Sequence, residues 1–431
     1  MASSRRAFLR AAGAAGLLGG LARGAATNPS SRPNVVLIIS DDHGWCDYGF
    51  MGHDRIKTPN LDAMARRGAT FGNGYVAAPL CCPSLTTLLT GLHPHQHKVS
   101  FNDPPRGGAA SRPTWLKDKV TIPRLLKAAG YRSLQTGKFW DGHFANAGFT
   151  EGMTVKGRHG DEGLAIGRQT MAPITTFLDD CKAKSEPFFL WYAPMMPHLP
   201  HTPPADILAK YADVGDAATA KYYAMVEWFD QTIGQLVKAL EDRGLRQNTL
   251  ILYLADNGWV QGHMSQKSGS PAARAGAGAG NKGKNTPFDG GVRTPIILDW
   301  PGQVKGGRYD ELVSSVDLAP TILAACGAQA PEGLPGVDLL PVACGREPLK
   351  RTAVCGAAYV HTAKDVDRPG ENLLYRWVRE GDWKLIVAKA DDSVQLYNLK
   401  DDPFENNDLA PQQADKVRHL RQVVDAWWDG R

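Results

Sequence analysis

The chain has 431 residues, of which 43% are hydrophobic and 22% are charged. These values exclude a small disulfide-stabilised protein, a collagen-like fibre and a disordered charged tail, and they are typical of a globular chain with a large core. The formal net charge is +5, but residues 1–26 hold four arginines and no acid, and the remainder has 45 basic and 44 acidic residues. Net charge therefore gives no reason to expect a nucleic-acid or membrane-surface partner.

The first 26 residues are predicted to be an export signal rather than part of the fold. Residues 4–10 read Ser-Arg-Arg-Ala-Phe-Leu-Arg, residues 11–21 are apolar and diluted by glycine and alanine, and residues 24–26 are small. This order fits a twin-arginine signal peptide, whose partner is the twin-arginine translocase. We expect the mature chain to be exported to the periplasm or the extracellular space. No later apolar run approaches the ~18 residues of a membrane span, so we expect no membrane anchor.

Short apolar segments recur along the chain, and each one ends at a polar or Gly/Pro-rich stop. They cover residues 35–39, 188–192, 249–254 and 295–298. Unbroken apolar runs of this length are typical of strands buried on both faces. Helices are predicted at 59–67, which Gly68 follows, and at 217–243, which carries an apolar stripe. The alternation predicts an α/β fold with a mostly parallel sheet flanked by helices.

The pattern changes from residue 352 onward. Alternating segments at 383–387 and 394–399 precede an amphipathic segment at 414–428. They predict a small antiparallel sheet with a helix, and we therefore expect a catalytic domain at 27–351 and a C-terminal α+β subdomain at 352–431. Residues 265–283 are rich in glycine, alanine and serine without apolar periodicity, and we expect a mobile loop there.

Polar side chains follow two of the predicted strands. Asp41 and Asp42 come after 35–39, and Asp256 and Asn257 come after 249–254. Ligands of open α/β sheets lie at the carboxyl ends of the strands, and an all-oxygen set suits Ca²⁺ or Mg²⁺. Either pair alone is equally typical of an ordinary turn.

Three further residues attract attention by their position. Lys138 follows a possible strand, and His198 lies in the Pro-rich segment 197–200, although each is also typical of an ordinary surface or loop residue. Cys81 precedes Pro83 and a helix that Gly91 ends. A thiol at a helix N-terminus is expected to be acidified.

The segment Cys81-Cys82-Pro83-Ser84-Leu85, followed by Thr90-Gly91, resembles the signature of the type I sulfatases of the alkaline phosphatase superfamily, Cys-x-Pro-Ser-Arg with a later Thr-Gly. Other family motifs recur in family order, from about Asn34 to Leu409. They are Asp41-Asp42, Gly137-Lys138, Pro197-His198-Leu199-Pro200, Asp256-Asn257-Gly258, residues 284–293 (Lys-Asn-Thr-Pro-Phe-Asp-Gly-Gly-Val-Arg), Leu396-Tyr397-Asn398-Leu399 and Asp402-Pro403-Phe404-Glu405. On these matches the chain is identified as a member of that family.

The resemblance implies an alkaline-phosphatase-like fold and hydrolysis of sulfate monoesters, with a sulfated carbohydrate or small molecule as the substrate. It implies that Cys81 becomes formylglycine through the formylglycine-generating enzyme. The implied ligands of one Ca²⁺ ion are Asp41, Asp42, Asp256, Asn257 and the modified Cys81. The implied catalytic residues are Cys81, Lys138, His198 and Lys284.

The implied reaction uses the two hydroxyls of hydrated formylglycine. One attacks sulfur and the alcohol leaves, and the second then expels sulfate. His198 and Lys284 are assigned to the leaving-group side, and either is a proton donor to the departing oxygen.

Two positions depart from the family pattern. Leu85 replaces an arginine that contacts formylglycine and belongs to the signal for modification, and Trp140 replaces a histidine. Two alternatives therefore stay open. One is a phosphonate monoester or phosphodiester hydrolase of the same superfamily, and the other is a catalytically silent binder of sulfated glycans.

Two further groups of residues have a possible place in substrate binding. Trp140, Trp259 and Phe101 are potential sugar platforms. The histidines of the segment 92–97 either line the substrate pocket or are exposed, and they are His93, His95 and His97.

Overall fold

A computed structural model of the protein describes residues 32–105, 114–156, 159–259 and 282–431. The predicted signal peptide at 1–26 lies outside the described residues. So does the expected mobile loop at 265–283, apart from its last two residues.

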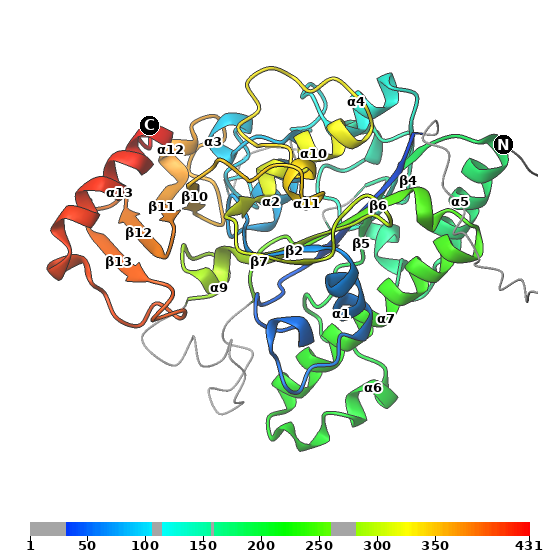
Figure 1. The fold of residues 1–431 in the computed structure, drawn as a ribbon, viewed down its shortest axis with the longest axis horizontal. Helices are drawn as coiled ribbons and strands as arrows, with labels where there is room; N and C mark the ends of the chain where they lie inside the picture. Colours follow the sequence, from blue (N-terminus) through cyan, green and yellow to red (C-terminus); the bar gives the residue numbers. More distant parts are fainter. Residues whose placement is uncertain (1–31, 106–113, 157–158, 260–281) are drawn as a thin grey trace, which may run out of the picture. The chain divides into compact units, whose positions relative to one another are not determined.

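One mixed sheet of nine strands organises the described residues, in the order β4-β3-β5-β1-β6-β7-β2-β8, with β9 pairing beside β2 (Figure 1). The strands are β1 (Asn34–Ser40), β2 (Ala69–Tyr75), β3 (Arg132–Gly137), β4 (Glu151–Gly152), β5 (Phe188–Ala193), β6 (Thr249–Ala255), β7 (Arg293–Asp299), β8 (Gly307–Tyr309) and β9 (Val313–Ser314). In this sheet β7 runs antiparallel to both neighbours, and the other pairs are parallel. The predicted mostly parallel sheet is confirmed.

Helices cover both faces of the sheet, so its central strands β1, β5, β6 and β7 are buried at every position. The helices within the described ranges, including those of the C-terminal part, are α1 (Pro59–Arg67), α2 (Cys81–Thr90), α3 (Pro94–His97), α4 (Ile122–Ala128), α5 (Ala172–Lys184), α6 (Ala205–Ala209), α7 (Ala217–Asp242), α9 (Asp289–Val292), α10 (Leu318–Ala325), α11 (Leu340–Ala343), α12 (Pro369–Asn372) and α13 (Ala414–Trp427).

The two faces of β1 show how the layers pack. Leu37 belongs to the apolar cluster that includes Leu88 of α2 and Leu126 of α4. Ile38, the next residue, belongs to the cluster that α1, α5 and α7 complete. Because side chains alternate along a strand, a strand between two helical layers must be apolar on both sides.

The C-terminal part is a four-stranded antiparallel meander, β10-β11-β12-β13, with α13 packed against it. Its strands are β10 (Ala353–Tyr359), β11 (Leu373–Glu380), β12 (Trp383–Ala388) and β13 (Val394–Asn398). Leu420 and Val424 of α13 lie in one cluster with Val378 and Leu385 of the sheet. The predicted antiparallel sheet with a helix is therefore confirmed.

None of the helices within the described ranges combines the length and apolar character that crossing a bilayer requires.

Candidate active site

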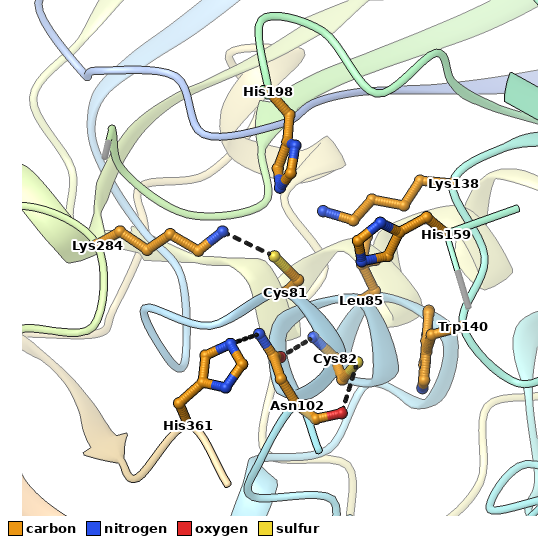
Figure 2. A pocket seen from close by; sticks show the side chains of 10 residues that line it. All are labelled: Cys81, Cys82, Leu85, Asn102, Lys138, Trp140, His159, His198, Lys284 and His361. Carbon is orange, nitrogen blue, oxygen red and sulfur yellow. Dashed lines mark hydrogen bonds between the residues drawn. The ribbon is translucent and has the colours of Figure 1, made fainter. Parts of the chain in front are cut away.

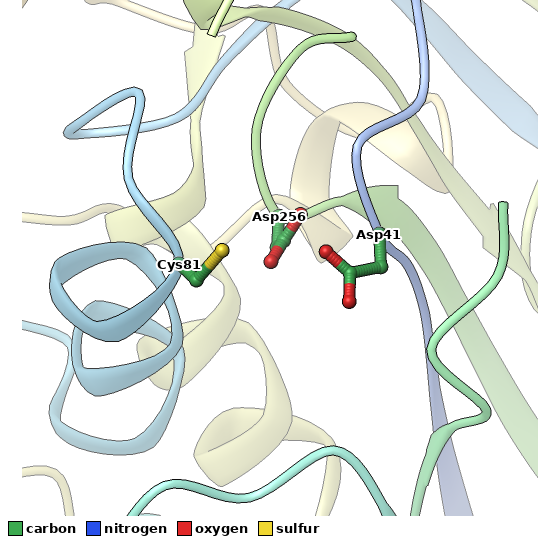
Figure 3. A group of neighbouring side chains, drawn as sticks. All are labelled: Asp41, Cys81 and Asp256. Atoms are coloured by element: carbon green, nitrogen blue, oxygen red, sulfur yellow. The ribbon is translucent and has the colours of Figure 1, made fainter. Parts of the chain in front are cut away.

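The polar residues after β1 and β6 meet because the two strands are parallel neighbours in register. Ser40 of β1 pairs with Ala255 of β6, so Asp41 and Asp256 leave the sheet at the same edge. The backbone N–H of Asp256 donates to Ser40 O at 2.9 Å, and the N–H of Asp42 donates to Asp256 Oδ1 at 3.3 Å. Both carboxylates point toward Cys81 (Figure 3).

Cys81 is the first residue of α2 and lies opposite these carboxylates. Its Sγ and one oxygen each of Asp41 and Asp256 lie within 4.8 Å of one another, and all three side chains are buried. A second group, Asp41, Asp42 and His198, satisfies the same distance. The structure thus brings together residues that lie far apart in the sequence.

Two lysines reach the same point from opposite sides. Lys138 Nζ lies 2.6 Å from both oxygens of Asp41 and 3.4 Å from Asp256 Oδ2. Lys284 Nζ donates to Asp42 Oδ1 at 2.5 Å and to Cys81 Sγ at 3.1 Å. The cysteine and the carboxylates are therefore held among fixed positive charges.

Close packing of the neighbouring backbone fixes the backbone positions of Lys138 and Lys284. Gly137 has a φ of 78°, and a Cβ there would lie 1.8 Å from Ala193 O, so only glycine lets the chain turn into Lys138. A Cβ on Gly258 would lie 1.8 Å from Gly290 O, which explains the glycines of both motifs. The backbone N–H of Lys284 then donates to Trp259 O at 2.8 Å.

His198 is tied to the end of β1 and has a defined orientation. The N–H of Asp41 donates to Met196 O at 3.0 Å, which places the loop of His198 beside the carboxylates. His198 Nδ1 lies 2.6 Å from Leu199 O, and because a carbonyl only accepts, Nδ1 carries a proton. Nε2 is then the nitrogen that faces Asp42, with 3.5 Å to Asp42 Oδ2.

Burial and charge act in opposite directions on this cluster. Burial acts to raise the pKa of Asp41, but Lys138, His198 and Lys284 outweigh it and hold that pKa below its ordinary range. Burial and the Asp41 carboxylate together raise the pKa of Asp256 to about 8. One carboxylate of the neighbouring pair is thus stabilised as an anion and the other is destabilised.

The expected acidification of Cys81 is wrong. Burial raises the pKa of the Cys81 thiol to about 11, although Lys138 and Lys284 act to lower it. Desolvation outweighs the position at the helix N-terminus, so an unmodified Cys81 is a neutral thiol at neutral pH.

The donor set fits a hard divalent cation. Three buried carboxyl groups face two ammonium groups, so the cluster carries one net negative charge once Asp256, whose pKa is raised to about 8, is ionised. The side-chain oxygen of Asn257 is buried without a hydrogen-bond partner, while its Nδ2 donates to Asp42 Oδ1 at 2.7 Å. Carboxylate and amide oxygens with an excess of negative charge are the ligands that Ca²⁺ prefers.

A cavity of about 200 Å³ opens onto the Cys81 side chain (Figure 2). Cys81, Lys138, His198 and Lys284, the four catalytic residues implied by the resemblance, all line it. The remaining lining residues are Cys82, Leu85, Asn102, Trp140, His159 and His361.

The two residues that depart from the family pattern both lie in this wall. Leu85 is 1% exposed and belongs to the apolar cluster of β1 and α2. Trp140 packs against Phe139, with 5.5 Å between ring centroids, and its buried Nε1 has no hydrogen-bond partner. Neither side chain supplies a charge to the cavity.

The prediction that Phe101 and Trp259 are sugar platforms is wrong. Phe101 is fully buried against Trp115, Trp259 packs with Cys46, and neither is among the lining residues described above. Each has its aromatic faces covered by the protein, so no sugar can stack on it.

The expectation for the histidine segment is also wrong. It forms the short helix α3, which begins just after His93, and it packs against α13, with 4.9 Å between the ring centroids of His95 and Trp427. His93 and His97 are buried, and the histidines of this segment are not among the lining residues named above.

Sequence reasoning missed Asn102, His159 and His361. His159 lies beside His198, with 5.8 Å between ring centroids, and His361 comes from the loop after β10. Isolated asparagine and histidine residues in loops carry no spacing signal, and only the three-dimensional packing places them here.

Comparisons with known proteins agree with this geometry. Residues 33–328 match the family model described as Sulfatase, and residues 281–426 match the one described as N-sulphoglucosamine sulphohydrolase, C-terminal. Arylsulfatase A of Bos taurus is 31% identical, covering 95% of this chain and 90% of its own length. N-acetylgalactosamine-6-sulfatase of Canis lupus familiaris is 30% identical, covering 75% and 68%. The crystal structure of Ps i-CgsB in complex with k-i-k-neocarrahexaose has a TM-score of 0.73 at 27% identity, covering 93% and 94%.

Proposed function

This chain belongs to the sulfatase family of the alkaline phosphatase superfamily and is a sulfuric ester hydrolase, and from that premise we propose that it cleaves sulfate monoesters of a carbohydrate. We include in the proposal a formylglycine formed from Cys81 and one bound Ca²⁺ ion. The observation that carries it is the convergence of Asp41, Asp256 and Cys81 within 4.8 Å at a cavity lined by lysine and histidine.

A formylglycine at residue 81 would, when hydrated, supply two geminal hydroxyls, one as the nucleophile toward sulfur and the other for the release of sulfate. Asp41, Asp42, Asp256, Asn257 and an oxygen of the modified residue 81 are the proposed ligands of Ca²⁺, which supplies a Lewis acid there. Asn257 would bind the ion through its side-chain oxygen, which has no hydrogen-bond partner.

The chain's own residues bind and orient the anionic ester. Lys138 and Lys284 direct two ammonium groups to the Cys81 end of the cavity, and preformed charge of this kind stabilises charge that builds up in the transition state. His198 has its proton on Nδ1 fixed by Leu199 O, so Nε2 is the atom that exchanges a proton with the departing oxygen. Lys284 is the other proton donor on that side.

The carbohydrate part of the proposal is supported by the relatives. One is named for a sulfated amino sugar, and the structure of another holds an oligosaccharide. We also propose export through the twin-arginine translocase to the periplasm or beyond, after action of the formylglycine-generating enzyme on the nascent chain. The sequence of residues 4–26 supports export.

Side-by-side rates on an aryl sulfate, an aryl phosphonate and a panel of sulfated sugars test the proposal. We expect inorganic sulfate to be released from an aryl sulfate and from at least one sulfated sugar, and the aryl phosphonate to react more slowly. Faster phosphonate hydrolysis would assign the site to the related phosphonate and phosphodiester hydrolases. An unmodified thiol at residue 81 in protein from the native host would contradict the formylglycine step.

A further inference from the structure

The start of helix α2 is held by a side chain from outside the helix. Leu80, the residue before the helix, makes no side-chain hydrogen bond to the first turn. The backbone N–H of Cys82 instead donates to Asn102 Oδ1 at 2.9 Å. Asn102 is 3% exposed and lies beside Cys82 in the cavity wall (Figure 2). It therefore satisfies one of the free N–H groups of the helix, as an N-cap residue does.

The direction of this hydrogen bond determines the orientation of the Asn102 amide and the protonation of the His361 ring. Because a backbone N–H can only donate, Asn102 presents its oxygen to Cys82 and its amide nitrogen to His361. Asn102 Nδ2 lies 3.3 Å from His361 Nε2, so Nε2 accepts and the ring proton is on Nδ1. His361 Nδ1 faces Asp103 Oδ2 at 3.4 Å. The chain of contacts runs from Asp103 through His361 and Asn102 to the amide next to residue 81.

Backbone hydrogen bonds hold the segment of Asn102 and Asp103 beside the segment of His361. The N–H groups of Asn102 and Asp103 both donate to His361 O, at 2.9 and 3.1 Å, and the N–H of Ala363 donates to Asp103 O at 2.8 Å. Asp103 also forms an isolated parallel bridge with Thr362. The loop after β10, in the C-terminal part of the chain, is thereby fixed to the segment that caps α2.

Accurate placement of residue 81 matters because its neighbours are close. Lys284 Nζ lies 3.1 Å from Cys81 Sγ, and the carboxylates of Asp41 and Asp256 lie within 4.8 Å of it. A movement of about 1 Å at a reacting group can cost a large part of a reaction rate. The first turn of α2 carries residue 81, so whatever holds that turn also sets these distances.

We infer that Asn102, His361 and Asp103 are positioning residues that hold the N-terminus of α2 and thereby orient residue 81 toward Lys284 and the carboxylates. The inference rests on the proposed function for the chemical role of residue 81. It assigns a part in the reaction to a loop of the C-terminal meander that carries no family motif.

Three variants test it, each assayed for sulfate release. Asn102→Leu removes the acceptor for Cys82 N–H, and His361→Leu removes the acceptor for Asn102. His361→Gln, the matched control, keeps a side-chain oxygen that accepts from Asn102. We expect kcat to fall about 10-fold in Asn102→Leu and His361→Leu with KM within about twofold, a loss typical of a missing cap. His361→Gln should retain kcat within about threefold, since its acceptor is kept.

The hydrogen-exchange rate of the peptide at the start of α2 tests the capping hydrogen bond in the absence of substrate. We expect about one more amide to exchange rapidly in Asn102→Leu and in His361→Leu, but not in His361→Gln. Unchanged exchange in Asn102→Leu, or a rise in KM with unchanged kcat, would overturn the inference. If wild-type protein releases no sulfate while exchange changes as expected, the proposed function fails and the capping contacts remain supported.

Discussion

Replacing Lys284 with methionine removes the ammonium group that contacts both Asp42 and the Cys81 side chain. Its Nζ lies 2.5 Å from Asp42 Oδ1 and 3.1 Å from Cys81 Sγ, and the side chain is 10% exposed. At about 3.1 Å and an effective dielectric constant of ~20, a unit positive charge interacts with a unit negative charge by about 5 kcal/mol. Losing one group of a preorganised site costs about 3–4 kcal/mol in practice, so we expect kcat to fall about 10²–10³-fold.

The assay is release of inorganic sulfate from an aryl sulfate at saturating concentration. Lys282→Met is the matched control, because it removes one positive charge from the same segment. Lys282 Nζ binds the carbonyls of Phe404 and Glu405 and is not among the residues that line the cavity. We expect the control to keep most of its kcat even if its melting temperature falls. A kcat for Lys284→Met within threefold of wild type would refute the electrostatic reasoning.

Three other predictions concern the metal, the core and the response to acid. Chelation of Ca²⁺ should abolish activity and lower the melting temperature, because an ion at about 100 times its Kd contributes about 2.7 kcal/mol, and added Ca²⁺ should restore both; a chelated protein with unchanged activity would contradict the site. Leu85→Ala should lower the free energy of unfolding by about 2–5 kcal/mol in urea titrations, since Leu85 is 1% exposed, and a loss below 1 kcal/mol would contradict its place in the core. Burial lowers the pKa of His93 to about 3, below its value of 6.5, so the folded state binds this proton less tightly than the unfolded state and stability falls as pH drops from about 6.5 toward 4. His93→Asn, which keeps a capping side chain, should lose about 2 kcal/mol less than wild type between pH 6.5 and 4.5, and parallel pH profiles would refute this.

The ends of the strands could be predicted because the relevant signal is local. An apolar run that stops at Asp41 marks a buried strand, and the same pattern before Asp256 marks another. Parallel neighbours bring their carboxyl ends to one edge, so the two carboxylates converge because β1 and β6 are adjacent, and this adjacency is known from the structure. The resemblance to the family motifs predicted that Cys81 and Lys284 lie in the same site.

The direction of β7 could not be predicted in this way. Its apolar residues read the same whether the strand runs parallel or antiparallel, and the structure shows it antiparallel to both β6 and β2. Strand direction depends on how the connecting segments return to the sheet, which the apolar pattern of one strand does not record.

The cavity wall depended on tertiary packing in a similar way. His361 follows a strand of the C-terminal meander and reaches the site only because its backbone pairs with Asn102 and Asp103. Phe101 and Trp259 were predicted to bind sugar because they are aromatic, but both side chains are buried in the structure. Residue type predicts that a ring is buried or stacked, and not which partner covers it.

Peptide mass spectrometry of residue 81, made on protein co-expressed with a formylglycine-generating enzyme and then assayed for sulfate release in Ca²⁺, tests the central claim most directly. The account predicts an aldehyde at this position and a rate that rises in proportion to the converted fraction. Sulfate release at full rate from protein whose residue 81 is entirely an unmodified cysteine would contradict it.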